Sequence, residues 1–166
     1  MNIVLVEPEI PQNTGNIART CAVTKTDLHL IRPLGFSTDD KYLKRAGLDY
    51  WDLVNVYYYD SLKEVLNRIQ KTGGNCFFSS TKAAQSYSEV EYSQNDFLFF
   101  GKETAGLPED FLLDNLDRCI RIPMRSDARS LNLSNSAAII LYEALRQQDF
   151  PDCTSYGKFQ QYNMQH

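Results

Sequence analysis

Short apolar runs recur along almost the whole chain, and segments with apolar residues at helical spacing lie between them. Each run is three to five residues long, which is typical of a buried strand. We expect strands over residues 2–6, 28–31, 55–59, 76–78, 97–100 and 119–122. We expect helices behind the turn at 13–16 and over residues 39–48, 61–72, 108–113 and 134–148. This alternation predicts an α/β domain with a mostly parallel sheet and flanking helices.

Several residues mark where these elements begin and end. The sequence Ser-Leu-Lys-Glu at 61–64 has the form of a capping box, and the glycines at 73–74 are expected to end that helix. Pro8 and Pro11 favour an extended segment. We therefore expect no helix at these prolines, and a turn ending at Asn16, which would cap the helix behind it.

Composition narrows the class of protein. Lys and Arg number 17 against 21 Asp and Glu, and this net charge of −4 argues against coating nucleic acid by charge alone. No apolar run is long enough to span a bilayer, and no signal peptide is recognisable. We expect a cytoplasmic protein with reduced thiols, one domain over residues 1–150 and a tail over 151–166. The sequence shows no zinc-type cysteine spacing and only two histidines, so we expect no metal site.

Ligands of parallel sheets bind at the carboxyl ends of the strands, so the segments that follow the strands are candidate sites. In the segment 11–19, Asn16 and Arg19 lie one helical turn apart, and an arginine there suits a phosphate. A plain strand-to-helix turn is the alternative. In the segment 101–108, the glycine spacing fits no phosphate-binding loop. It suits a bent loop around a neutral or zwitterionic ligand, or a structural turn.

The third candidate segment, 122–135, carries arginines next to hydroxyl and amide side chains at the start of the last predicted helix. One or two of these side chains would cap the helix, but their number suggests a polar pocket beside an anion-binding edge. A fourth feature is the basic group Lys41, Lys44 and Arg45 ahead of Tyr50 and Trp51. It is either a solvated helix face or a patch that binds RNA.

In this order the segments resemble the motifs of SPOUT-class methyltransferases, most closely the small tRNA 2′-O-methyltransferases of the TrmL (YibK) type. The matching residues are 7–11, 13–19, 45–51, 101–108 and 122–135. The resemblance implies a SPOUT fold with a C-terminal deep trefoil knot, and a homodimer. It also implies transfer of a methyl group from S-adenosyl-methionine to the wobble ribose, cytidine or uridine 34, in the anticodon stem-loop of tRNA, with leucine tRNAs as substrates.

Residues at the family's motif positions take their expected roles from this resemblance. The expected catalytic residues are Arg19, Glu103, Ser130 and Asn135. The expected cofactor-binding residues are Ser79, Gly101, Ile122, Ser130 and Leu131. The expected RNA-binding residues are Lys41, Lys44, Arg45, Arg125 and Arg129.

The chemistry of these residues agrees with the resemblance. A ribose hydroxyl is a weak acid, so its methylation needs a base or stabilisation of the oxyanion, and Arg19 is expected to favour the alkoxide by its charge. Two departures from the family pattern are Lys25, where many relatives have glycine, and Lys102, where relatives can carry proline. An RNA-binding relative without catalysis, or an unrelated nucleotide-binding α/β protein, are the competing interpretations.

Overall fold

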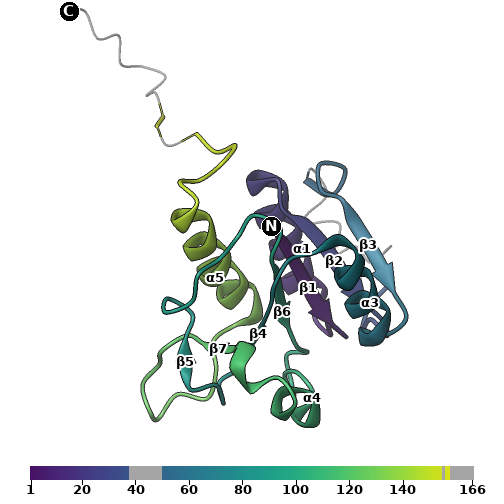
Figure 1. The fold of residues 1–166 in the computed structure, drawn as a ribbon. Helices are drawn as coiled ribbons and strands as arrows, with labels where there is room; N and C mark the ends of the chain where they lie inside the picture. Colours follow the sequence, from purple (N-terminus) through teal and green to yellow (C-terminus); the bar gives the residue numbers. More distant parts are fainter. Residues whose placement is uncertain (38–49, 155, 158–166) are drawn as a thin grey trace, which may run out of the picture.

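The computed structural model describes residues 1–37, 50–154 and 156–157. Within them, seven strands form one parallel sheet in the order β3-β2-β1-β6-β4-β7-β5 (Figure 1). The strands are β1 Asn2–Val6, β2 Asp27–Ile31, β3 Val56–Tyr59, β4 Cys76–Ser79, β5 Gln85–Ser86, β6 Phe97–Phe100 and β7 Cys119–Arg121. Because every pair is parallel, the carboxyl ends of the strands share one edge, the lower one in Figure 1.

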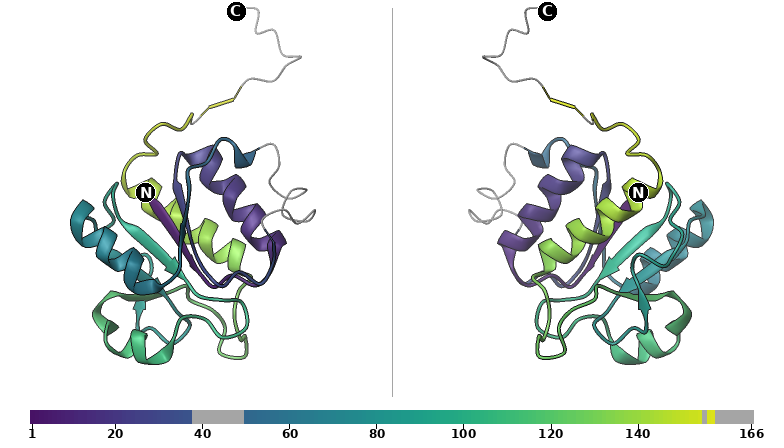
Figure 2. Two further views of the ribbon diagram at one scale, coloured as in Figure 1. Left: turned by 90° about the vertical axis from the view of Figure 1, so that its right-hand side faces the viewer. Right: turned by 90° about the vertical axis from the view of Figure 1, so that its left-hand side faces the viewer.

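Helices cover both faces of the sheet. The helices are α1 Pro11–Thr24, α3 Leu62–Thr72, α4 Glu109–Leu113 and α5 Leu133–Gln147, with a 3₁₀ turn at Leu116–Arg118. Helices α1 and α5 lie side by side on one face, and α3 covers the other (Figure 2). The α/β class with a mostly parallel sheet and flanking helices is therefore confirmed.

The central strand β1 shows why its run is continuously apolar. Ile3 and Leu5 point into the core under α1 and α5, whereas Val4 and Val6 point into the core under α3 and α4. A strand buried on both faces needs apolar residues at every position. The same holds for β6, whose four residues are all buried.

The start of α1 corrects one expectation. The helix begins at Pro11, so Asn16 lies inside it and does not cap it. Proline is favoured in the first turn because its fixed φ suits a helix and its missing N–H would have no partner there. Strand β5, within residues 82–95, was also not expected. The predicted helix over 39–48 falls outside the described residues, and the C-terminal trefoil knot stays a prediction.

Other end signals are confirmed. Ser61 Oγ accepts a hydrogen bond from the Glu64 N–H at 3.3 Å, and the Glu64 carboxylate accepts one from the Asp60 N–H at 2.9 Å. Gly73, with φ of 79°, ends α3. Lys25 ends α1 in a left-handed conformation with φ of 51°, so this helix stops as one with a terminal glycine would.

Candidate functional site

A cavity of about 560 Å³ lies at the carboxyl ends of β4, β6 and β7. Its wall comes from three segments that follow strands: residues 79–82, 100–107 and parts of 122–136. Ile10 and Asn13, at the start of α1, and Leu112 of α4 complete it. This is the edge at which parallel sheets bind ligands.

All five residues that sequence reasoning assigned to a cofactor line this one cavity. They are Ser79, Gly101, Ile122, Ser130 and Leu131. Gly101 is required by packing, because a Cβ there would overlap the backbone of Gly106 and Leu107. The loop after β6 is closed by a hydrogen bond of 2.8 Å from the Gly106 N–H to the Lys102 carbonyl.

Glu103 joins this loop to the start of α1. Its carboxylate accepts hydrogen bonds from the N–H of Glu9 at 2.8 Å and of Ile10 at 3.2 Å. It also accepts one from Asn13 Nδ2 at 2.9 Å. The first N–H groups of a helix lack partners within the helix, and its dipole favours a negative charge at that end. Glu103 therefore holds the cavity wall and the helix together.

Two asparagines extend this connection to the third segment. Asn132 Nδ2 donates to Asn13 Oδ1 at 3.0 Å. Asn132 Oδ1 in turn accepts from the N–H groups of Ser134 at 2.9 Å and Asn135 at 3.3 Å, and so caps α5. Because a carboxylate only accepts, the contact with Glu103 fixes which way both amides point. We call Glu103, Asn13 and Asn132 the cavity network.

Sequence reasoning treated Asn13 as a turn residue and Asn132 as one of several polar residues near a cap, and it missed their pairing. The two lie 119 residues apart. The only available signal was that each amide stands in a candidate site segment. Asn13 is 5% exposed, and a buried amide needs polar partners.

A second set of contacts fixes the same loop from outside. Lys102 Nζ lies 2.8 Å from the Glu7 carboxylate, which raises the pKa of Lys102. Hydrogen bonds from the Thr104 hydroxyl, at 2.8 and 2.9 Å, and from its N–H, at 3.0 Å, lower the pKa of Glu9. The loop is thus held by residues that directly follow β1.

Comparison with known proteins assigns the family. The sequence model of the SpoU rRNA Methylase family matches residues 1–142. The chain belongs to this family. A Bacillus subtilis protein named as a candidate tRNA (cytidine(34)-2′-O)-methyltransferase is 58% identical to this SpoU methylase, over 92% of the chain and 96% of that protein. The tRNA (cytidine(34)-2′-O)-methyltransferase of Yersinia pestis is 48% identical, over 91% and 96%.

Solved structures agree with the fold. A structure described as giving insights into the 2-OH methylation of C/U34 on tRNA is 43% identical, with a TM-score of 0.82, and the match covers 89% of this chain and 95% of that one. The SpoU methyltransferase AviRb of Streptomyces viridochromogenes, in complex with the cofactor AdoMet, is 25% identical, with a TM-score of 0.78. That match covers 90% of this chain and 58% of AviRb.

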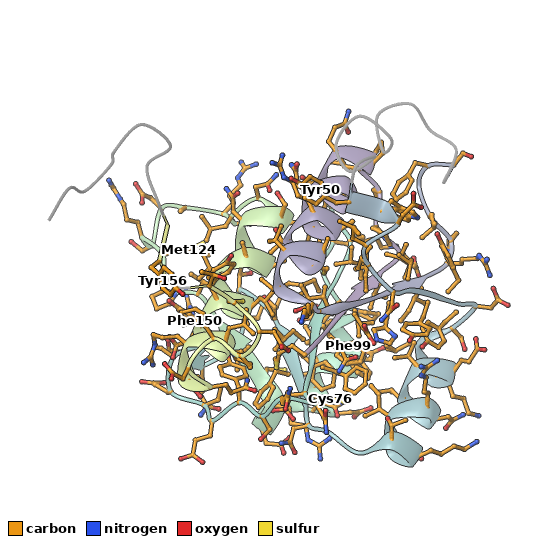
Figure 3. The ribbon with its side chains drawn as sticks, turned by 90° about the horizontal axis from the view of Figure 1, so that it is seen from above. Tyr50, Cys76, Phe99, Met124, Phe150 and Tyr156 are labelled. Atoms are coloured by element: carbon orange, nitrogen blue, oxygen red, sulfur yellow. The ribbon has the colours of Figure 1, made fainter. Side chains whose placement is uncertain are left out.

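Of the four predicted catalytic residues of this SpoU methylase, two line the cavity and two lie outside its lining. Ser130 and Glu103 line the cavity. Asn135 is exposed and contributes its backbone N–H to the cap of α5. Arg19 lies on the exposed side of α1 and outside the cavity lining, with its guanidinium carbon 4.8 Å from the centre of the Tyr50 ring. Figure 3 shows Tyr50 beside this helix.

The predicted RNA-binding residues also differ in where they lie relative to the cavity. Arg129 lines the cavity. Arg125 is exposed and pairs through two hydrogen bonds, of 3.0 and 2.9 Å, with Asp127. The remaining three predictions lie outside the described residues: Lys41, Lys44 and Arg45.

The described residues contain no group of three or more His, Cys, Asp or Glu that could hold a metal ion. Their helices include none that is long and apolar enough to cross a membrane.

Proposed function

We propose that this SpoU methylase transfers a methyl group from S-adenosylmethionine to the ribose 2′-oxygen of cytidine or uridine 34, the wobble nucleotide of tRNA. The names of relatives that match nearly the whole chain at 48% and 58% identity support this substrate. The observation that carries the proposal is the single cavity that gathers all five predicted cofactor residues. The cavity network joins two of the three wall segments, 100–107 and 122–136, to the start of α1.

The cavity suits the cofactor by size and chemistry. Its volume of about 560 Å³ is in the range of small-molecule sites. Leu107, Ile122 and Leu131 offer an apolar surface, and the loop after β6 offers backbone donors and acceptors. These features fit an adenine ring and an amino acid group better than a chain of phosphates. When bound, the cofactor supplies an electrophilic methyl group attached to a sulfonium.

The chain's own residues orient the second substrate. We expect Ser130 and Arg129, at the cavity, to contact the ribose and its phosphate, with Arg19 stabilising the alkoxide by its charge. Glu103 and Asn135 take part by fixing the cavity wall and the start of α5. Holding the two reactants in line is expected to supply much of the acceleration.

The same proposal includes a homodimer acting on the anticodon stem-loop of leucine tRNAs in the cytoplasm. Residues 1–150 would form the catalytic domain and 151–166 a tail. Large apolar side chains on the paired helices α1 and α5 support the dimer. They are Val23, Ile139 and Tyr142, with 53%, 36% and 47% exposed. Arg125, Lys41, Lys44 and Arg45 would add RNA contacts around the cavity.

Methyl transfer to unmodified tRNA tests the activity. Purified protein is mixed with labelled S-adenosylmethionine and leucine tRNA transcripts, and the product is mapped by mass spectrometry. We expect label at the ribose of nucleotide 34 and none in a transcript whose nucleotide 34 is a 2′-deoxynucleotide. Label in other tRNAs to the same extent would contradict the leucine preference. Absence of label from all tRNAs, with a folded protein that binds the cofactor, would contradict the activity.

A further inference from the structure

A second cavity, which we call the β2–β3 pocket, lies beside the first along the same edge of the sheet. Its volume is about 570 Å³. Its described lining residues follow β2, or lie at or just after the end of β3: Arg32, Pro33, Leu34, Phe36, Ser37, Tyr58 and Asp60. None of them has a role in the proposed methyl transfer.

The pocket contains a layered pair of flat side chains. The Arg32 guanidinium carbon lies 5.3 Å from the centre of the Tyr58 ring. Its Nη1 donates to the Asp60 carboxylate at 2.8 Å. Asp60 therefore holds the guanidinium over the ring, while 52% of the Arg32 side chain stays exposed. A planar guanidinium fixed in this way offers an open face on which a further ring can stack.

The charge balance of the pocket indicates what kind of ring. The positive charge of Arg32 is already matched by Asp60, and no other charged side chain is among the described lining residues. The pocket is thus poorly suited to a phosphate and better suited to a neutral aromatic ring with polar edges. Phe36 and Leu34 add apolar surface. Nucleobases that have left a helical stack are such ligands.

Short backbone contacts connect the two cavities. The Gly35 N–H donates to the Pro8 carbonyl at 2.9 Å, and a Cβ on Gly35 would lie 2.7 Å from the Glu9 Cα. On its other side, the Glu9 N–H donates to Glu103, in the wall of the first cavity. One short segment therefore separates the pocket from the site of methyl transfer.

We propose that the β2–β3 pocket binds an unpaired base of the substrate RNA, next to the nucleotide that is methylated, by stacking it on the Arg32–Tyr58 pair. This inference rests on the proposed function, because it names a further part of the same RNA. It adds a contact outside the cofactor cavity. Because only an unpaired base can enter the pocket and stack there, this contact favours a single-stranded loop over a paired stem.

The first experiment looks for the stack directly. Anticodon stem-loop RNAs carry the fluorescent base 2-aminopurine at each unpaired position flanking nucleotide 34 in turn. We expect wild-type protein to quench one of these positions strongly. Tyr58→Phe is expected to retain the quenching, because the ring remains, and Tyr58→Ala is expected to lose it. Quenching at no position would overturn the proposal.

The second experiment separates a base from a phosphate. Arg32→Lys keeps the charge and a partner for Asp60 but lacks the planar face. We expect it to raise KM for the stem-loop roughly ten-fold, the usual size of one stacked base. The kcat and the cofactor Kd should not change. An RNA without a base at the quenched position should show no such difference between wild type and Arg32→Lys.

Arg118→Lys is the matched control. Arg118 also lies next to an aspartate, at 3.8 Å from Asp117, but it precedes β7 and so lies at the opposite edge of the sheet. We expect wild-type KM. Equal losses for Arg32→Lys on intact and abasic RNA, or no loss on either, would overturn the pocket while leaving the methyl transfer intact. A wild-type protein that methylates no RNA would overturn both proposals.

Discussion

The protein contains two networks of polar side chains, and they differ in what lies beside them. The cavity network of Glu103, Asn13 and Asn132 borders a cavity at the carboxyl ends of the strands. The other, which we call the core network, consists of Tyr59, His29, Asn2 and Asp96. It runs across the strands through hydrogen bonds of 2.9 Å between Tyr59 and His29, 3.1 Å between His29 and Asn2, and 3.3 Å from the Asn2 amide to the backbone carbonyl of Asp96.

None of the residues of the core network lines either of the two cavities described above. His29 is 1% exposed, and its ring stacks against Tyr57 and Tyr59. Asp96 is fully buried and accepts the N–H groups of Asn75 at 2.8 Å and Ser93 at 2.7 Å. Both networks satisfy polar groups that burial would otherwise leave without partners. Changes in the core network should therefore alter stability, and changes in the cavity network should alter catalysis.

The largest effect is expected at Asp96. Asp96→Ala removes a buried carboxylate and leaves two partly buried N–H groups without their acceptor, and a hydrogen bond to a charged group contributes about 1.5–3 kcal/mol. We expect the free energy of unfolding to fall by about 4 kcal/mol, as measured by urea denaturation. Glu91→Ala, at an exposed residue nearby in sequence, is the control and should change stability little. A small loss for Asp96→Ala would show that water or a rearranged loop replaces the carboxylate.

The next effect is a dependence of stability on pH through His29. Burial lowers the pKa of His29 to about 4 from the ordinary 6.5, so the folded state holds the neutral ring. The neutral ring contributes fully to the stability of the folded protein above pH 6.5. This contribution is lost as the pH falls from 6.5 to about 4, because the unfolded state then binds a proton that the folded state does not. The total loss is about 3 kcal/mol, because one pKa unit corresponds to about 1.4 kcal/mol.

Unfolding measured at several pH values between 6.5 and 4.5 tests this. This interval avoids the carboxylate of Glu143. Hydrogen bonds from Arg146 and Gln147 lower the pKa of Glu143 to about 2 from 4.5, so its stabilising contribution is lost only below pH 4.5. The variant His29→Asn should be less stable throughout but should show a flatter dependence. An equal slope in the variant would assign the dependence to other groups.

A change in the cavity network should lower activity and leave the protein folded. Asn13→Asp keeps the size of the side chain but replaces the amide that donates to Glu103 with a second carboxylate. We expect kcat/KM to fall about 100-fold, which is the cost of small displacements in an active site. Steady-state kinetics with tRNA measure it, and circular dichroism at neutral pH should show a folded protein. Full activity would show that the network is dispensable for catalysis.

The same two networks show how far sequence reasoning reaches. Local patterns sufficed for every strand except β5, for the capping box at Ser61 and for the site segments, because periodicity and end signals act over a few residues. The family motifs located Ser79, Gly101, Ile122, Ser130 and Leu131 around one cavity. Pairings such as Asn13 with Asn132 depend on how distant segments meet, which no local pattern encodes.

The start of α1 was predicted wrongly at Pro11 and Asn16 for a related reason. Pro11 is compatible with both an extended segment and a first helical turn, and the tertiary acceptor Glu103 decides between them by binding the N–H groups of Glu9 and Ile10. The sequence of the helix alone does not contain that acceptor. His29, likewise, was recognisable as a histidine within an apolar run, but not as a partner of Tyr59 and Asn2.

The smallest expected effect is at Arg19. Because this residue belongs to neither network, its replacement should change turnover alone. Its described contacts are with Tyr50 alone, at 3.5 Å between Nη2 and the hydroxyl and 4.8 Å over the ring, and it is exposed. Arg19→Ala should therefore leave the free energy of unfolding and the cofactor Kd unchanged. We expect kcat to fall at least ten-fold, because the variant lacks the positive charge that we propose to stabilise the alkoxide. Arg19→Lys should recover part of that loss if charge is the main contribution, and unchanged turnover in Arg19→Ala would remove Arg19 from the catalytic residues.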